Sequence, residues 1–534
     1  MTVRIAGMNS QCRLIGAVMV WAVCAAAQSG ALAAQDTAAC SCPELLDALA
    51  TKIEANYPGY HLEVKGQARE DDYRRHRSAM RVAAESAGAG IECLRILQAY
   101  VVWFEDGHIF VGGRPHVSTP ADTARLRDAA PRVAWRETDV LHYLDERRDG
   151  LDAVEGIWLD PAGLKVAVVR QGMDAAARAS DAVPGRFIGF VLTSSAEGWQ
   201  PGDVKAELTA LPDGSYDVIV YDDVRAQTRP HVYKRGHAGG GRLQRDGLLF
   251  HMPPTTWGKA YPVRPGQEGL IDAVDPRAPT ARVTDTGAVV FHVPSHVPTH
   301  ARRLRSLVEQ YRSALQRAET LIIDLRGNEG GSTFVTDVLM PYLVTPDKRP
   351  ARYLADGAAA VLASADNIGY FERASWAPAG LVARLRAAEP GTVVAFADPT
   401  PADREAAESA PSTAIATTNP RTTNPRNVAI LTDAMTVSAA EAFVLKAMRN
   451  TKVTLFGEPT GSSIDYQTVG IVGFGCRDAG LYVGYPTIIG SDRLPQGGVR
   501  PTGIVPDVPV VKSVDPIRVI MEYYGRIRER EGER

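Results

Sequence analysis

Two apolar runs that each lead into a turn constrain the fold of this chain more than any other feature. The first, Leu321–Leu325, runs into the glycine-rich segment 326–331. The second, Val428–Leu431, runs into a turn that ends at Ser438, where an alanine-rich helical stretch begins. Apolar runs of this length are typical of buried strands, and their alternation with helices predicts an α/β layer domain. We place this domain at residues 281–515.

The rest of the 534 residues divides by pattern. Apolar positions at helical spacing predict a helical region over residues 35–150. Short β-rich runs separated by turn residues predict a small antiparallel barrel-like domain over residues 151–280. A segment rich in Ala, Pro and Thr, at about 346–427, predicts a low-complexity insertion in the α/β domain, and residues 516–534 predict a C-terminal helix. The predicted fold class is therefore α+β multidomain.

The N-terminus has the pattern of a secretory signal. Arg4 and Arg13 precede the apolar run Leu14–Ala27, and Ala31-Leu32-Ala33 supplies the small residues that a signal peptidase accepts. The alternative is an uncleaved membrane anchor, for which the run is short. We predict a signal peptide over residues 1–34, no transmembrane span after its removal, and a periplasmic or secreted protein.

Four cysteines remain after removal of that signal: Cys40, Cys42, Cys93 and Cys476. In an oxidising compartment a disulfide is expected, and Cys93 paired with Cys40 or Cys42 would join the mature N-terminus to the next helical segment. The sequence does not choose between these partners. Metal binding by Cys40 and Cys42 is the alternative, but no His or Cys cluster stands beside them.

Other features of the sequence argue against metals, cofactors and nucleic acids as partners. His292, His296 and His300 recur every fourth residue, but Pro294 and Pro298 interrupt any helix that would align them on one face. The formal net charge is only −3 and no basic stripe is present, so nothing indicates nucleic-acid binding. We expect no metal and no organic cofactor.

The two turns carry residues suited to acyl transfer. Ser438, at the start of a helix, is either an N-cap or a nucleophile whose developing charge the helix dipole favours. The backbone N–H groups of Gly330, Gly331 and Ala439 are candidates for an oxyanion hole. Each segment alone has an ordinary structural explanation.

Taken in order, four segments resemble peptidase family S41, which includes the C-terminal processing and tricorn-like serine peptidases. The family signatures "DLRGNGGG", "S-A-[SA]-E-x", "G-E-x-T" and "G-[IV]-x-P-D-[IV]" correspond to Asp324–Gly331, Ser438–Ala442, Gly457–Thr460 and Gly503–Val508. The resemblance implies a core fold related to crotonase and ClpP, with Ser438 as the nucleophile. It covers about the last 250 residues.

The resemblance leaves the general base to be assigned. Members of the processing branch use a lysine in a "T-F-G-K-G" loop, but the matching position here is Ser463. The tricorn-like branch uses a histidine, and the tripeptide Asp106-Gly107-His108 fits its "D-G-H" pattern. We therefore expect His108 to be the base. Two positions depart from that branch, because Gly107 stands where it has a serine and Arg500 where it has a glutamate.

The residue that orients His108 is thus open, with Asp106, Asp465 and Ser463 as candidates. The resemblance implies a serine endopeptidase or carboxyl-terminal-type peptidase whose partners are extended peptides or unfolded proteins. The departures keep an alternative open, a catalytically weak relative that binds peptides. An oligomer is compatible with the sequence, and cleavage preference is not readable from it.

Overall fold

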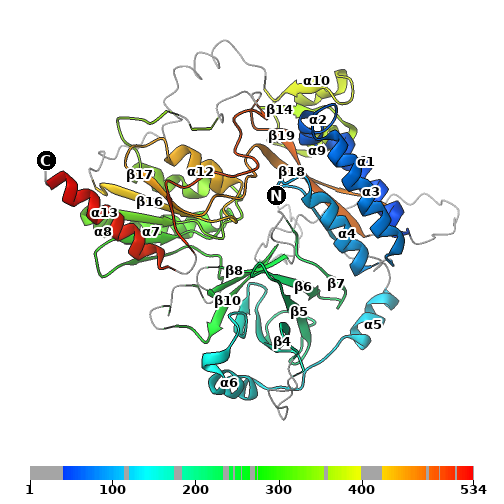
Figure 1. Ribbon diagram of the computed structural model, residues 1–534, viewed down its shortest axis with the longest axis horizontal. Coiled ribbons are helices and arrows are strands. Elements are labelled where there is room, and N and C mark those ends of the chain that lie inside the picture. Colours follow the sequence, from blue (N-terminus) through cyan, green and yellow to red (C-terminus); the bar gives the residue numbers. More distant parts are fainter. Residues whose placement is uncertain are drawn as a thin grey trace, which may run out of the picture. The chain divides into compact units, whose positions relative to one another are not determined.

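The computed structural model describes residues 40–88, 90–113, 120–172, 183–232, 240–244, 247–253, 255–264, 267, 271–272, 275–350, 352–353, 359–397, 424–476, 480–491, 494–511 and 514–532 (Figure 1). The predicted signal peptide, residues 1–34, lies outside the described residues. From Ala39 onward the chain forms one compact unit. Its elements divide among three sheets, and the structure is mixed α/β as expected.

A six-stranded sheet forms the centre of the predicted α/β domain. The strands lie in the order β11-β12-β13-β16-β17-β20, parallel except for the edge strand β11. Helices α7, α8 and α12, with the 3-10 helix η4, cover one face, and α13 covers the other. Both faces are therefore buried, which explains the continuous apolar runs in the sequence. The bounds are β11 Thr280–Val283, β12 Val289–His292, α7 His300–Gln310, α8 Arg312–Arg317, β13 Thr320–Asp324, η4 Thr333–Tyr342, β16 Asn427–Thr432, α12 Ala439–Ala447, β17 Val453–Gly457, β20 Val508–Pro509 and α13 Pro516–Gly532.

The β-rich middle of the chain is a closed antiparallel barrel, as predicted. Eight strands follow the order β5-β4-β3-β2-β10-β9-β8-β6, and pairing between β5 and β6 closes the ring, with β7 added on β6. Closure removes the exposed edges that an open sheet would present. The bounds are β2 Gly156–Asp160, β3 Leu164–Arg170, β4 Arg186–Ser194, β5 Val204–Ala210, β6 Tyr216–Tyr221, β7 Gln227–Thr228, β8 Gly240–Gln244, β9 Leu249–Met252 and β10 Thr255–Tyr261, preceded by α5 Pro120–Ala129, α6 Glu137–Glu146 and η1 Arg148–Gly150.

The N-terminal helices pack against a third sheet that later segments of the chain supply. Strand β1 pairs antiparallel with β19, which also pairs with β14 and β18. Leu45, Leu46, Leu49 and Ile53 are buried in this layer, as their helical spacing predicts. The bounds are α1 Cys42–Asn56, α2 Pro58–Glu63, α3 Glu70–Ser86, α4 Ile91–Val102, β1 Phe110–Gly113, β14 Ala360–Leu362, α9 Ala365–Arg373, α10 Leu381–Ala387, β15 Val393–Ala395, β18 Tyr466–Gly473 and β19 Leu481–Ile489.

The segment predicted as a low-complexity insertion, about 346–427, is not uniform. Its first half forms β14, α9, α10 and β15 and contributes to the third sheet, so this part of the prediction is wrong. Phe371, Leu381 and Leu385 are fully buried there, and they supply the core that composition alone did not reveal. Residues 398–423 lie outside the described residues.

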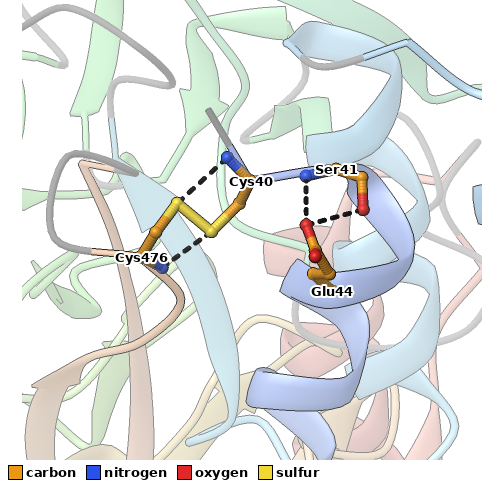
Figure 2. Close-up of a disulfide and its surroundings, with 4 residues drawn as sticks. All are labelled: Cys40, Ser41, Glu44 and Cys476. Atoms are coloured by element: carbon orange, nitrogen blue, oxygen red, sulfur yellow. Dashed lines mark hydrogen bonds between the residues drawn. A yellow bond between two sulfur atoms is a disulfide. The ribbon is translucent and has the colours of Figure 1, made fainter. Parts of the chain in front are cut away.

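Two disulfides join the N-terminal helices to other elements. Cys42 pairs with Cys93, which is one of the two predicted partnerships and connects α1 to α4. Cys40 pairs with Cys476 in the turn after β18, across a separation of 436 residues (Figure 2). Next to that bond, both the amide and the hydroxyl of Ser41 donate to Glu44 at the start of α1. The two bonds therefore tie α1 both to α4 and to the β18–β19 hairpin.

No helix among the described residues is both long enough and apolar enough to cross a membrane.

Candidate active site

Ser438 occupies the turn between β16 and α12, directly before the first residue of the helix. Its backbone has φ 57° and ψ −120°, a conformation that costs energy for any residue with a side chain. Two bonds from neighbouring segments hold it: the amide of Val437 donates to the carbonyl of Asn328 at 3.0 Å, and the amide of Ser438 donates to Ser463 Oγ at 2.7 Å. Strain that surrounding contacts maintain is a common property of functional serines in such turns.

The glycine turn after β13 packs directly on this serine. Gly330 has φ 83°, and a Cβ added there would lie 2.6 Å from the Cβ of Ser438. Only glycine allows the two segments to approach so closely. The amide of Gly330 donates to Asn328 Oδ1 at 2.9 Å. By contrast, the amides of Gly331 and Ala439 have no hydrogen-bond acceptor within the described parts of the chain.

Asn328 organises this turn from within the core. Its Nδ2 donates to the carbonyl of Val293 at 2.6 Å, and its Oδ1 lies 2.9 Å from Nδ1 of the fully buried His296. Burial lowers the pKa of His296 to about 4, so the ring is neutral and donates to Asn328. The other two histidines of the four-residue repeat have different partners. Nδ1 of His292 lies 3.5 Å from Oδ2 of Asp324, and Nε2 of His300 lies 2.9 Å from Oδ2 of Asp275.

Glu441, in the first turn of α12, fixes the loop that follows β17. Although it is buried, its carboxylate accepts hydrogen bonds from the hydroxyl of Thr460, the amide of Ser462, and both the amide and hydroxyl of Ser463. It also accepts from the amide of Ser438 at 3.2 Å. Burial raises the pKa of Glu441, and these donors offset part of that effect.

His108 follows the helical region, and a backbone carbonyl orients its ring. Its Nδ1 lies 2.6 Å from the carbonyl oxygen of Tyr466, which can only accept, so Nδ1 carries the proton. In the neutral ring Nε2 is then the basic nitrogen. A Cβ added at Gly107 would lie 3.2 Å from the Cβ of Ser463, whose hydroxyl accepts from the amide of Ser438. Ser463 therefore contacts both the turn of His108 and the turn of Ser438.

Comparison with known proteins finds a family match over part of the chain. The sequence profile of peptidase family S41 matches residues 288–510, a range that includes Ser438 and all four signature segments. Over these residues, which make up less than half of the chain, the protein is similar to peptidase family S41. His108 and the barrel lie outside the matched range, so the profile does not assign them. No curated protein matches the chain.

Solved structures of S41 peptidases resemble the chain only distantly. Mature CPAF is 11% identical, with 88% of this chain and 93% of that chain covered and a TM-score of 0.36. The photosystem II D1 C-terminal processing protease is 12% identical. The match covers 90% of this chain and 95% of that protease, with a TM-score of 0.29. The tricorn protease is 11% identical. The match covers 91% of this chain and 36% of the tricorn chain, with a TM-score of 0.33. The similarity to the family therefore rests on the profile match over residues 288–510.

The three candidate orienters of His108 are Asp106, Asp465 and Ser463, and their hydrogen bonds go to groups other than the ring of His108. Asp106 accepts from the backbone amide of His108 at 2.9 Å and from the hydroxyl of Tyr57 at 2.8 Å. Asp465 accepts from the amides of Val499 and Arg500, and its pKa is raised by burial. The ring of His108 instead donates from Nδ1 to the main-chain carbonyl of Tyr466.

Arg500, the departure from the tricorn-like pattern, supports the segment that leads to His108. Its guanidinium donates to the carbonyls of Phe104 and Glu105, at the end of the helical region, and to Glu63 at 2.9 Å. Both carbonyl groups lie just beyond the end of α4 at Val102, in the turn that leads to His108. An arginine in place of the expected acid thus acts on the backbone of the His108 turn rather than on its ring.

A pocket opens beside these turns. Its lining comes from the serine turn and its neighbours, and also from the barrel: Gly107, Ala434, Met435, Val437 and Gly461 on one side, and His231, Gly240, Gly241, Arg242, His251 and Pro253 on the other. Residues next to Ser438 and His108 therefore share one cavity with side chains of β8 and β9.

Glu441→Gln is expected to damage both stability and activity. The amide nitrogen of glutamine would face N–H and O–H donors, so the unfolding free energy should fall by about 2–4 kcal/mol. Because the same carboxylate holds Ser438 and Ser463, kcat should fall at least about tenfold. Chemical unfolding and peptide cleavage measure these effects. Glu522→Gln on α13, with an exposed side chain, is the control, and equal behaviour of both variants would contradict the assigned role.

Proposed function

We propose that the chain is an exported serine endopeptidase or carboxyl-terminal-type peptidase that hydrolyses peptide bonds in extended peptides or unfolded proteins. Ser438 is the nucleophile and His108 the general base. The observation that carries this proposal is the meeting of three segments: the strained serine at the start of α12, the glycine turn packed on it, and Ser463 in contact with the turn that carries His108.

The proposed chemistry uses only groups of the chain. His108 Nε2 takes the proton of the Ser438 hydroxyl as Oγ bonds to the substrate carbonyl carbon. The amides of Gly331 and Ala439 donate to the resulting oxyanion, whereas that of Gly330 is already bonded to Asn328. Collapse breaks the C–N bond, and His108 returns the proton to the leaving amine. Water then hydrolyses the acyl-enzyme by the same proton path.

Export is supported by the two disulfides, which persist in oxidising compartments. It is also supported by the signal pattern of residues 1–34. The alternative, a catalytically weak peptide-binding relative, draws its support from Arg500, which stands where an acid would orient the base. No metal or organic cofactor takes part in the proposed mechanism.

A fluorophosphonate probe tests the nucleophile directly. An activated serine oxygen displaces fluoride and forms a stable O–P bond, so we expect one equivalent of label on the tryptic peptide that contains Ser438. The measurement is mass spectrometry of the labelled, mature protein together with cleavage of an unfolded protein substrate. Cleavage with label on another serine would overturn the assignment of Ser438. Peptide binding with neither label nor cleavage would favour the weak relative.

A further inference from the structure

Two side chains of the barrel reach the glycine turn of the peptidase core. His251 on β9 places Nε2 2.8 Å from Glu329 Oε1. Gln244 on β8 packs against Gly327, where an added Cβ would lie only 2.0 Å from its Oε1. Both contacts fall on the segment 325–331, which also packs on Ser438. The barrel is therefore in direct contact with the turn that supplies part of the proposed oxyanion hole.

The contact at Glu329 is unusual for the family, and its two buried atoms lie at ion-pair distance without the alignment of a hydrogen bond. The family signature "DLRGNGGG" has glycine where this chain has Glu329. His251 is almost completely buried, and its second ring nitrogen lies 3.0 Å from Thr256 Oγ1 on β10. Burial raises the pKa of Glu329, but the nearby His251, with Arg277 and His231, outweighs this, so the pKa is lowered and the side chain is a carboxylate.

Glu329 lies between the two residues that shape the oxyanion turn. Asn328 before it is hydrogen-bonded to Val293 and His296, and Gly330 after it touches Ser438. A side chain held at this point limits the rotation of the following peptide units, including the amide of Gly331. Small misplacements of such donors cost rate rather than binding, because their bonds strengthen only as the oxyanion forms.

We propose that His251 and Glu329 are positioning residues for catalysis, through which the barrel holds the oxyanion turn of the peptidase core in its working geometry. This inference rests on the proposed function of Ser438 and Gly331. It gives the barrel a part in the reaction, because the peptidase domain would carry a misaligned turn without it.

The test uses the mature, full chain with His251→Phe, Glu329→Gly and the double variant. Each single change is expected to lower kcat about 10- to 100-fold with KM within about twofold, since the lost contact acts on transition-state groups. The double variant should be no worse than the poorer single variant, because one contact is removed in all three. His251→Gln, which retains a donor toward Glu329, should recover most of the rate.

His142→Phe is the matched control, since His142 is an exposed histidine on α6. It should leave kcat and KM unchanged. The inference is overturned if both single variants keep the wild-type kcat, if they change KM alone, or if His251→Gln is as slow as His251→Phe. Glu329→Gly restores the family residue and keeps the test valid should His251→Phe fail to fold. A wild-type protein without Ser438-dependent cleavage would instead defeat the proposed function, so the two failures are distinguishable.

Discussion

Replacement of Ser438 by alanine is expected to lower kcat/KM for peptide cleavage by about 10⁴- to 10⁶-fold. In a serine peptidase the hydroxyl oxygen forms the acyl bond, and the remaining rate comes only from binding and the oxyanion donors. The expected change in stability is small, because alanine keeps the Cβ that packs against Gly330 and the amide that donates to Ser463. Cleavage of an unfolded protein and thermal melting measure the two effects.

A second helix-capping serine provides the matched control. Ser364 precedes α9, and its hydroxyl accepts from the amide of Asn367 at 3.2 Å. Ser364→Ala should cost about 1 kcal/mol of stability and leave kcat/KM unchanged. If Ser438→Ala behaves in the same way, Ser438 is an N-cap and the peptidase mechanism fails at its first step.

The sequence predicted the parts of the site that depend on local pattern. The strand, glycine turn and serine turn follow from short runs in which hydrophobicity and residue type change within ten residues. Strand spacing likewise predicted the barrel, because each hairpin leaves its own turn signal. The close packing of Gly330 on Ser438 explains why glycine stands at that position, since any side chain would separate the two turns.

What the sequence missed depends on contacts between distant segments. Cys476 as the partner of Cys40 and the Tyr466 carbonyl as the partner of His108 join positions more than 350 residues apart. No local pattern indicates such pairs, because many registers satisfy the same hydrophobic alternation. Glu441 lay within a recognised signature, so its place beside Ser438 offered a signal, whereas nothing in the sequence distinguished His251.

The role of Arg500 shows how a departure from a family pattern can be misread. Taken alone, an arginine at the position of a glutamate suggests a damaged site. In the structure it donates to the carbonyls of Phe104 and Glu105, and the main chain at Tyr466 orients the ring of His108. A carbonyl can select the Nδ1–H tautomer as a carboxylate does, but it does not add a full negative charge to stabilise the imidazolium. The Nδ1 of the proposed base is therefore held by a neutral acceptor, which assists the base less strongly than a carboxylate would.

Replacement of His108 by alanine is expected to lower kcat/KM about 10³- to 10⁵-fold, because the hydroxyl of Ser438 then loses its proton acceptor. Added imidazole should restore part of the rate in proportion to its concentration, since a small base can occupy the space that the ring leaves. A histidine with a purely structural role would give a variant that imidazole does not rescue. Steady-state cleavage rates with and without imidazole measure the effect.

His61→Ala is the control for this experiment. His61 on α2 is also a histidine of the N-terminal helical region, and its Nε2 lies 2.9 Å from the carbonyl of Glu54 rather than near the serine turn. It should retain the wild-type rate and show no response to imidazole. Full activity of His108→Ala would remove His108 from the mechanism and leave Ser438 without a base, because the lysine position of the processing branch is occupied here by Ser463, whose hydroxyl already donates to Glu441 at 2.9 Å.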